Sequence, residues 1–349
     1  MKDPMPTQRS RRGITTCAVA TLITLATTAT LAACSSAASS SPGSSPSVSA
    51  PSVSASSVSA PSVSTGAASA GDSFPLTLKT SAGAVTIKAK PARIVSLSPT
   101  ATEDLWAVGA GSQVVAVDLS SNYPAGVPKT SLNGVTPNVE AIVHYNPSLV
   151  VTYQDANGLV AGLKKLGVPV LIEPAVTSVA GAYAQIEQIG QATGHAAGAQ
   201  AVVSGMQKQI ATDLQNAGTT HSDLSYYWEL SANPYYSATS KTFIGAIVGM
   251  FGLKNIADAA DKAADGGYPQ LTEEYIVTSK PQVIFLADNQ PSDGGQTPAV
   301  VAARPGWSAI PAVKNHEVIG LNDDVASRWG PRLPQLVAQI AAAIESVSK

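Results

Sequence analysis

Cysteine is scarce in this 349-residue chain, occurring only at Cys17 and Cys34, both close to the N-terminus. Two cysteines so close to the N-terminus cannot cross-link the rest of the fold. This excludes a disulfide scaffold and any cysteine-ligated zinc or iron–sulfur centre. Charge is sparse as well, since 13% of the residues are charged and the formal net charge is −2. No strong electrostatic field draws such a chain to nucleic acid, so we expect no nucleic-acid partner.

The sequence motifs of several enzyme classes are missing too. There is no Gly-x-Ser-x-Gly, no His-Glu-x-x-His and no phosphate-binding Gly-x4-Gly-Lys-Ser/Thr motif. The four histidines, His144, His195, His221 and His316, are scattered and form no recognisable set of metal ligands. We therefore predict a protein that is not an enzyme, with no catalytic residue, no resident cofactor and no metal held by its own side chains.

The few charges are unevenly distributed, which divides the chain into three segments. Residues 1–12 contain four basic side chains against Asp3, and residues 13–71 contain no charged side chain at all. Residues 72–349 contain 17 basic and 22 acidic side chains, a net charge of −5. The near-neutral total is thus a sum over a basic start, an uncharged stretch and an acidic body.

The first 33 residues have the pattern of a secretory signal peptide, with a basic start followed by the uncharged run Ile14 to Ala33. Its ending, Leu31-Ala32-Ala33-Cys34, resembles the bacterial lipobox, which implies that Cys34 is diacylated and becomes the first residue. The alternative is a transmembrane helix, but seven threonines in this run lower its hydrophobicity. Arg11-Arg12 also resembles part of a twin-arginine signal, and the export route stays open.

Residues 35–72 comprise 17 serines and 8 alanines among 38 residues, with a repeated Pro-Ser-Val-Ser-Ala unit. Such a segment buries too little apolar surface to offset its chain entropy, so we predict that 34–72 is a lipidated cysteine followed by a disordered tether. A flexible coil of this length spans on the order of 30–40 Å. We therefore expect a protein anchored by lipid to the outer face of the cell membrane.

From Phe74 onward, apolar alternation predicts a small hairpin, and then β-rich runs alternate with helical patterns. This order predicts an α/β fold with mostly parallel sheets, divided into a lobe at 73–195, a long helix at 196–217 and a second lobe at 218–349. The predicted strands are 93–97, 113–118, 148–153, 169–173, 225–230, 235–238, 282–287 and 317–321, and the predicted helices are 101–108, 139–145, 159–166, 178–193, 243–251, 273–278 and 333–346. Thr100 and Glu103 have the spacing of a helix capping box.

One pattern occurs twice. Glu140-Ala-Ile-Val-His-Tyr-Asn-Pro147 and Glu274-Tyr-Ile-Val-Thr-Ser-Lys-Pro281 share the pattern Glu-x-Ile-Val-x-x-x-Pro, and a buried strand follows each. Each glutamate would lie near the start of a helix, where the helix dipole favours a negative charge. Either the two carboxylates only stabilise their helices, or they form a pair of acidic contacts facing a two-fold partner. The repetition favours the pair.

The body resembles the helical-backbone substrate-binding proteins of ABC importers for iron-siderophores, haem and cobalamin. The resemblance covers about residues 74–349 and rests on Pro91-Ala-Arg-Ile-Val-Ser-Leu-Ser-Pro-Thr-Ala-Thr-Glu103, Asn122-Tyr123-Pro124, Asn138-Val139-Glu140, Pro147-Ser-Leu-Val-Val151, Leu166-Gly-Val-Pro-Val170, Gly306-Trp307 and Trp329-Gly-Pro-Arg332. It implies a monomer of two Rossmann-like lobes joined by one rigid helix, with a ligand cleft between the lobes. It also implies that Glu140 and Glu274 match the carboxylates that dock onto arginines of the permease dimer.

In open α/β sheets, ligands lie beyond the carboxyl ends of the strands. That rule predicts a ligand cleft formed by Ser98, Thr100, Asn122, Tyr123, Tyr153, Trp228, Tyr235, Tyr236, Asp324, Arg328 and Trp329, with Gln154, Glu229 and Asp288 beside them. Flat aromatic side chains suit a macrocycle or a catecholate, and Arg328 or Lys241 could neutralise an anionic chelate. Each aromatic could equally cap a sheet edge or be buried.

The frequency of each ligand in this family ranks a ferric siderophore before a corrinoid such as vitamin B12, with haem last. Haem-binding members ligate iron through Tyr or His, and no clear equivalent aligns here. Two other classes stay open. One is an exported hydrolase with an unrecognised site, and the other is a sensing or adhesion lipoprotein on the same fold.

Overall fold

The computed structural model describes residues 73–80, 83–291 and 295–347. The predicted signal peptide, Cys34 and the tether lie outside these residues. Among the described residues, no helix is both long and apolar enough to cross a membrane.

The first lobe is built on a four-stranded parallel sheet in the order β4-β3-β5-β6. Its strands are β3 (Ile94–Leu97), β4 (Val114–Val117), β5 (Leu149–Thr152) and β6 (Val170–Ile172), all within predicted ranges. The helices α1 (Pro99–Ala107), α2 (Val139–Val143) and α3 (Leu159–Lys165) connect them. The predicted hairpin is β1 (Leu76–Thr80) with β2 (Gly83–Ile87), an antiparallel pair that places Leu76 opposite Ile87.

The second lobe repeats this plan with a parallel sheet in the order β10-β7-β11-β12. Its strands are β7 (Ser225–Glu229), β10 (Lys254–Asn255), β11 (Val283–Leu286) and β12 (Val318–Gly320). The helices of this half are α6 (Phe243–Gly249), α7 (Glu273–Ser279), α8 (Pro298–Ala302), α9 (Pro311–Lys314), α10 (Asp323–Ser327) and α11 (Leu333–Val347). The prediction of one strand over 235–238 needs correction, because only β9 (Tyr235–Tyr236) forms there, and it pairs with β8 (Ser231–Ala232) outside the main sheet.

The two sheets correspond strand by strand. The second strand in each order, β3 or β7, is the first strand of its parallel sheet along the chain, and the third, β5 or β11, follows the helix that contains the repeated glutamate pattern. Ser148 and Gln282, the residues after the repeated prolines, both hydrogen-bond to the start of the neighbouring strand. The backbone N–H of Ser148 donates to the carbonyl of Arg93, and that of Gln282 donates to the carbonyl of Ser225. The sequence repeat is therefore a structural repeat.

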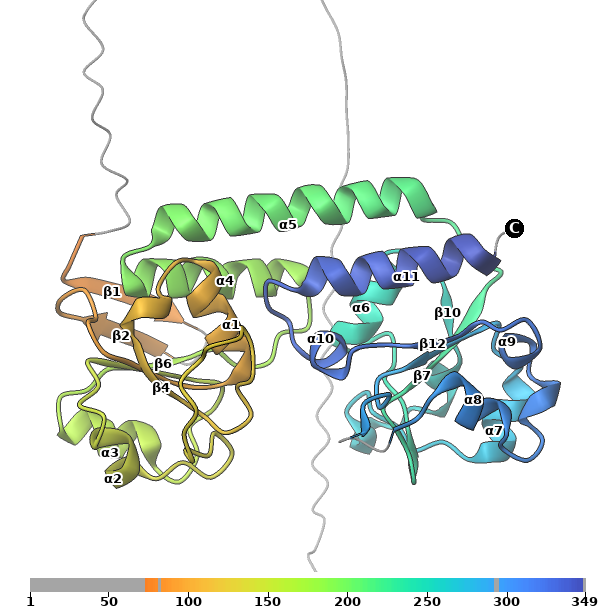
Figure 1. Cartoon of the computed structure of the whole chain (residues 1–349), viewed down its shortest axis with the longest axis horizontal. Coiled ribbons are helices and arrows are strands. Elements are labelled where there is room, and N and C mark those ends of the chain that lie inside the picture. Colours follow the sequence, from red (N-terminus) through yellow and green to blue (C-terminus); the bar gives the residue numbers. More distant parts are fainter. Residues whose placement is uncertain (1–72, 81–82, 292–294, 348–349) are drawn as a thin grey trace, which may run out of the picture. The chain divides into compact units, whose positions relative to one another are not determined.

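Three long helices run across the two lobes, with α5 (Ala196–Ala217) lying over α4 (Val179–Thr193) and α11 (Figure 1). Helix α4 starts at the N-cap Ser178 and ends at the left-handed Gly194. Helix α5, at the range predicted for the long helix, packs against α4 from the first lobe and against α11 from the second. The approach is close, since a Cβ on Gly190 would lie 2.4 Å from that of Ala199, and one on Gly198 would lie 2.2 Å from the Val108 carbonyl oxygen.

Candidate functional site

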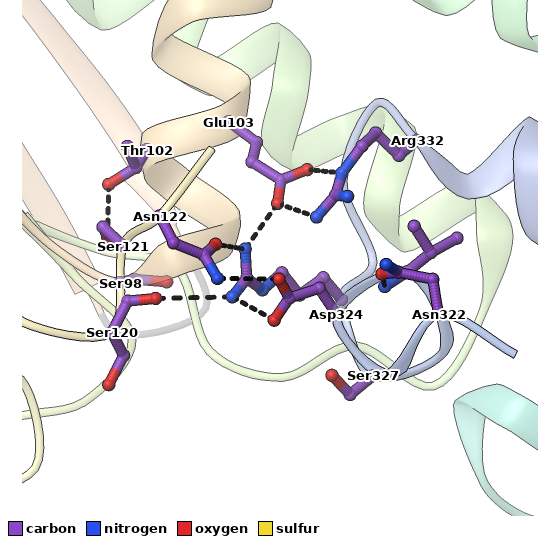
Figure 2. A network of polar contacts seen from close by, with 12 residues as sticks. Ser98, Thr102, Glu103, Ser120, Ser121, Asn122, Asn322, Asp324, Ser327 and Arg332 are labelled. Atoms are coloured by element: carbon purple, nitrogen blue, oxygen red, sulfur yellow. Dashed lines mark hydrogen bonds and ion pairs between the residues drawn. The ribbon is translucent and has the colours of Figure 1, made fainter. Parts of the chain in front are cut away.

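A buried carboxylate of the first lobe binds two arginines from the second. Glu103 lies on α1 with 1% of its side chain exposed, and Arg328 and Arg332 lie between α10 and α11 with 10% and 12% exposed. Arg328 Nη1 donates to Glu103 Oε1 at 2.8 Å, and Arg332 donates through Nε and Nη2 at 2.7 and 2.6 Å (Figure 2). Charge-assisted hydrogen bonds of this kind offset the cost of desolvating the three groups.

The loop after β4 joins the same network. The Asn122 amide donates to Asp324 Oδ2 at 2.8 Å and accepts from Arg328 Nη1 at 2.8 Å (Figure 2). Arg328 also donates to the Ser120 carbonyl at 3.3 Å and pairs with Asp324, four residues before it. Asp324 lies in the first turn of α10, which begins at the N-cap Asn322. The structure thus brings together three predicted cleft residues, Asn122, Asp324 and Arg328. We call this set, with Glu103 and Arg332, the interlobe network.

Side-chain hydroxyls fix the first-lobe half of the network at the carboxyl ends of β3 and β4. Ser98 is the N-cap of α1, and its hydroxyl accepts from the Ala101 backbone N–H at 3.3 Å. Thr102 bonds to the hydroxyls of Ser96 and Ser121 at 2.9 and 2.8 Å. Because Ser98 is the cap, the capping-box interpretation of Thr100 and Glu103 is wrong: Glu103 is occupied by arginines instead.

Two further acids lie behind the interlobe network without hydrogen-bond partners. Asp104 Oδ1 and Glu173 Oε1 are buried and unpaired among the described residues. Burial raises the pKa of Asp104 well above its ordinary value, and the carboxylates of Glu103 and Glu173 raise it further. Burial alone raises the pKa of Glu173 to about 8. A Cβ on Gly330 would lie 3.3 Å from Asp104 Oδ1, so the segment holding both arginines also covers this acid.

The corresponding strand ends of the second lobe hold a second charged cluster. Glu229, fully buried at the end of β7, accepts two hydrogen bonds from Arg304 at 2.7 and 2.6 Å. The Arg304 guanidinium lies over the ring of Trp307 at 4.4 Å and that of Tyr235 at 5.3 Å. Asp288, two residues beyond β11, has both carboxylate oxygens buried, and neither has a hydrogen-bond partner in the part of the chain that the structure describes. Burial together with Glu229 raises the pKa of Asp288 to about 7.

The remaining predicted cleft residues divide by exposure. Tyr123 and Tyr236 are 43% and 40% exposed, and Arg332 stacks on the Tyr123 ring at 4.3 Å. Trp228 is a core residue, fully buried against Phe285. The others lie in intermediate or buried positions: Ser98 and Thr100 are buried, while Tyr153, Gln154, Tyr235 and Trp329 are half-buried. The Trp329 indole N–H donates to Gln185 at 2.8 Å, and the predicted cation Lys241, an exposed side chain, instead pairs with the buried carboxylate of Asp261.

The two repeated glutamates occupy equivalent positions. Glu140 is the second residue of α2 after the N-cap Asn138, and Glu274 is the second residue of α7 after the N-cap Thr272. Both side chains belong to exposed residues, and neither has an ion-pair partner among the described residues. Each lobe therefore presents one free carboxylate at the same structural position.

Comparison with known proteins shows which family has this two-lobed arrangement. A family model described as periplasmic binding protein matches residues 94–325, which include both sheets. The chain belongs to the periplasmic binding protein family. It is 34% identical over 280 residues to the uncharacterized ABC transporter substrate-binding lipoprotein YvrC of Bacillus subtilis, covering 78% of this chain and 86% of the relative. It is 30% identical over 283 residues to the cobalamin-binding protein of Halobacterium salinarum, covering 79% and 76%.

A solved structure gives the same fold. The heme-binding protein RhuT of Roseiflexus superposes with a TM-score of 0.64 at 24% identity, covering 73% of this chain and 99% of RhuT. This similarity, with the parallel sheets and α5, confirms the predicted architecture of a two-lobed periplasmic binding protein. Sequence reasoning missed Glu103, Arg332 and Gln185 as members of the interface between the lobes. Glu103 and Arg332 are the last residues of two motifs quoted for the family resemblance. The sequence therefore singled out both residues but did not show that they contact each other.

Proposed function

We propose that this chain is the substrate-binding component of an ABC importer and captures a metal chelate between its lobes. The observation that carries the proposal is the interlobe network, which joins the carboxyl ends of the first-lobe strands to the segment following β12. That is where open α/β sheets bind ligands. Tyr123 beyond β4 and Tyr236 beyond β7 add exposed aromatic surface, which suits a large flat ligand. The relatives named above, which are binding proteins, support this function over an exported hydrolase.

We propose a corrinoid as the first ligand to test. The sequence alone ranked a ferric siderophore ahead, but the relative from Halobacterium salinarum is named as cobalamin-binding at 30% identity. A ferric hydroxamate and haem follow as competitors. Neither a corrinoid nor a ferric hydroxamate requires a metal ligand from the protein, because the metal arrives already chelated.

The test is a titration of the purified full chain with cyanocobalamin, a ferric hydroxamate and haem. Quenching of tryptophan fluorescence follows binding, since Trp329 lies beside the interlobe network, and calorimetry gives the stoichiometry. We expect saturable 1:1 binding of the corrinoid. The absence of binding by all three chelates, together with turnover of an ester or a peptide, would favour the hydrolase. The absence of both would favour the sensing or adhesion lipoprotein.

We further propose that Glu140 and Glu274 dock onto basic residues of a two-fold permease. The support is their matched place at the starts of α2 and α7, one in each lobe, with both side chains free. A symmetric partner requires equivalent contacts from both halves of an asymmetric chain, and an internal repeat provides them.

Export and anchoring complete the proposal. Residues 1–33 would be the signal peptide and 34–72 the lipidated Cys34 with its tether, ahead of lobes at 73–195 and 218–349 joined by 196–217. The relative YvrC is named a lipoprotein, which supports anchoring at the outer face of the cell membrane. A monomer held in this way would deliver its ligand to a permease in the same membrane.

A further inference from the structure

A cavity of about 810 Å³ lies outside the interlobe network, between the β1–β2 hairpin and the first sheet. Strands β2 and β6, helix α3 and the segments that follow β2 and precede β6 supply most of its wall. Its apolar lining includes Val85, Val160, Val168, Val170 and Ile172. A space of this size lies in the range that holds a whole ligand or several residues of a peptide.

Two strand edges face this cavity. Strand β6 is the last in its sheet, and β2 pairs with β1 alone among the strands that the structure describes. The Val150 N–H donates to the Pro169 carbonyl at 3.0 Å, and the Glu173 N–H donates to the Thr152 carbonyl at 2.8 Å. Because bonding direction alternates along a strand, Val170 and Ile172 between them turn their backbone groups away from β5. Both residues line the cavity, so it is bordered by an open edge.

The charge of this cavity contrasts with that of the body. Three lysines line it, Lys88, Lys90 and Lys164, and none of the described residues that line it is acidic, although residues 72–349 have a net charge of −5. Lys90 donates to the Gly194 carbonyl at 3.1 Å. Lys88 and Lys164 are exposed and have no ion-pair partner among the described residues. Two uncompensated positive charges thus flank an open strand edge.

We propose that this groove docks an extended acidic segment of a partner protein, which adds as a strand to the edge of β6. The segment's backbone would exchange hydrogen bonds with Val170 and Ile172, as in other cases of strand addition. Its apolar side chains would cover Val85 and Val160, and its carboxylates would pair with Lys88 and Lys164. An open strand edge is an aggregation hazard unless it is covered or charged. The lysines therefore also disfavour pairing of this edge with strands that are not acidic.

The experiment uses the full chain and two fluorescent hexapeptides, one alternating glutamate with valine and the other alternating lysine with valine. We expect saturable binding of the acidic peptide only, measured by fluorescence anisotropy. The bound peptide should slow amide hydrogen exchange at Val170 and Ile172. Lys88→Gln with Lys164→Gln should weaken binding at least tenfold, whereas Lys165→Gln, a neighbour on α3 that does not line the cavity, should not.

A backbone variant separates strand addition from simple charge attraction. Ile172→Pro removes an N–H that points away from β5, and an edge strand tolerates proline there. It should abolish the exchange protection at Val170 and weaken binding of the acidic peptide at least tenfold, while the corrinoid titration stays unchanged. The proposal is overturned by no saturable binding of the acidic peptide, by equal binding of both peptides, or by full binding to the Ile172→Pro variant.

Discussion

Arg332 and Glu103 are 229 positions apart in the chain, yet their side chains share two hydrogen bonds of 2.7 and 2.6 Å. Glu103 belongs to the helix that follows the first strand of the first sheet, and Arg332 immediately precedes the last helix. Arg328 adds a third hydrogen bond to the same carboxylate. One buried acid thus ties the beginning of the fold to its end.

Removing that acid should be costly. Glu103→Gln leaves Arg332, about nine-tenths buried, without its counter-charge and leaves Arg328 with Asp324 alone, and breaking a buried ion pair from one side typically costs about 3–5 kcal/mol. We expect a loss of unfolding free energy on the order of 3 kcal/mol, measured by urea denaturation. Glu187→Gln, which changes an exposed acid on α4 that has no ion-pair partner among the described residues, is the control and should change stability little. Equal effects of the two variants would contradict a structural role for the network.

The unpaired acid behind the network predicts a pH dependence of stability. The pKa of Glu173 is raised from 4.5 to about 8 in the folded chain, so between these values the folded state holds a proton that the unfolded state has lost. The contribution of Glu173 to the unfolding free energy should therefore be highest below pH 4.5, fall as the pH rises to about 8, and then level off. Denaturation series at pH 5 and pH 8 should differ by up to about 4 kcal/mol for this group.

Glu173→Gln tests the assignment. The variant should be more stable than the parent at pH 8, and its curve should be flatter between pH 5 and 8. Glu187→Gln, an exposed acid on α4, is the matched control and should leave the slope unchanged. An unaltered slope in Glu173→Gln would show that the carboxyl is hydrated and ionised in the folded chain.

Ligand affinity should depend on the aromatic surface beyond β4. Tyr123 is 43% exposed with its ring held by Arg332, so it offers a flat apolar face that is already ordered. We expect Tyr123→Ala to weaken corrinoid binding about tenfold, an effect of about 1.4 kcal/mol. Leu166→Ala removes an even more exposed apolar side chain, which follows α3, and should not affect the titration. Unchanged affinity for Tyr123→Ala would move the ligand away from the β4 loop.

Substitution of the two repeated glutamates should impair docking to the permease without changing ligand affinity. Glu140→Ala combined with Glu274→Ala should preserve ligand affinity and reduce cellular uptake, because both carboxylates lie on the outer turns of α2 and α7. The control, Glu187→Ala combined with Glu345→Ala, removes two other exposed acids. Normal uptake in the first double variant would rule out the pair as the permease contact.

The proposed lipid anchor depends on one side chain, the thiol of Cys34. Cys34→Ser should release the protein from membranes, measured by fractionation of cells and medium. Cys17→Ser lies inside the predicted signal peptide and should leave the protein anchored. Continued membrane association of Cys34→Ser would favour an uncleaved hydrophobic helix.

The sequence predicted the central strands well and the shortest elements poorly. Strands β3, β5, β7 and β11 are buried apolar runs next to helical patterns, so local sequence identifies them. The helices α8, α9 and α10 have only four or five residues, too few to show a period, and were missed. Trp228 illustrates another limit, because a strand end fixes the position of a residue without fixing which side of the sheet its side chain covers.

The site was predictable only in part for a similar reason. The strand-end rule selected Asn122, Asp324 and Arg328, which do meet. Glu103 could not be assigned from its own surroundings, since Thr100 nearby gave it a plausible local role as a cap. Its true partners come from the far end of the chain, and single-sequence patterns contain no information about such distant pairs.

Helix α5 has a mechanical consequence. Its 22 residues correspond to about 33 Å of α-helix, and it is packed along its sides by α4 and α11 rather than ending in a loose hinge. A helix packed in this way resists a wide separation of the two lobes. The distance between Glu140 and Glu274 should therefore differ little between the empty and the loaded protein. A permease that recognises this spacing would accept both forms, and the empty protein would then act as a competitor of the loaded one. At a given amount of bound ligand, uptake should therefore be slower when more of the binding protein is empty.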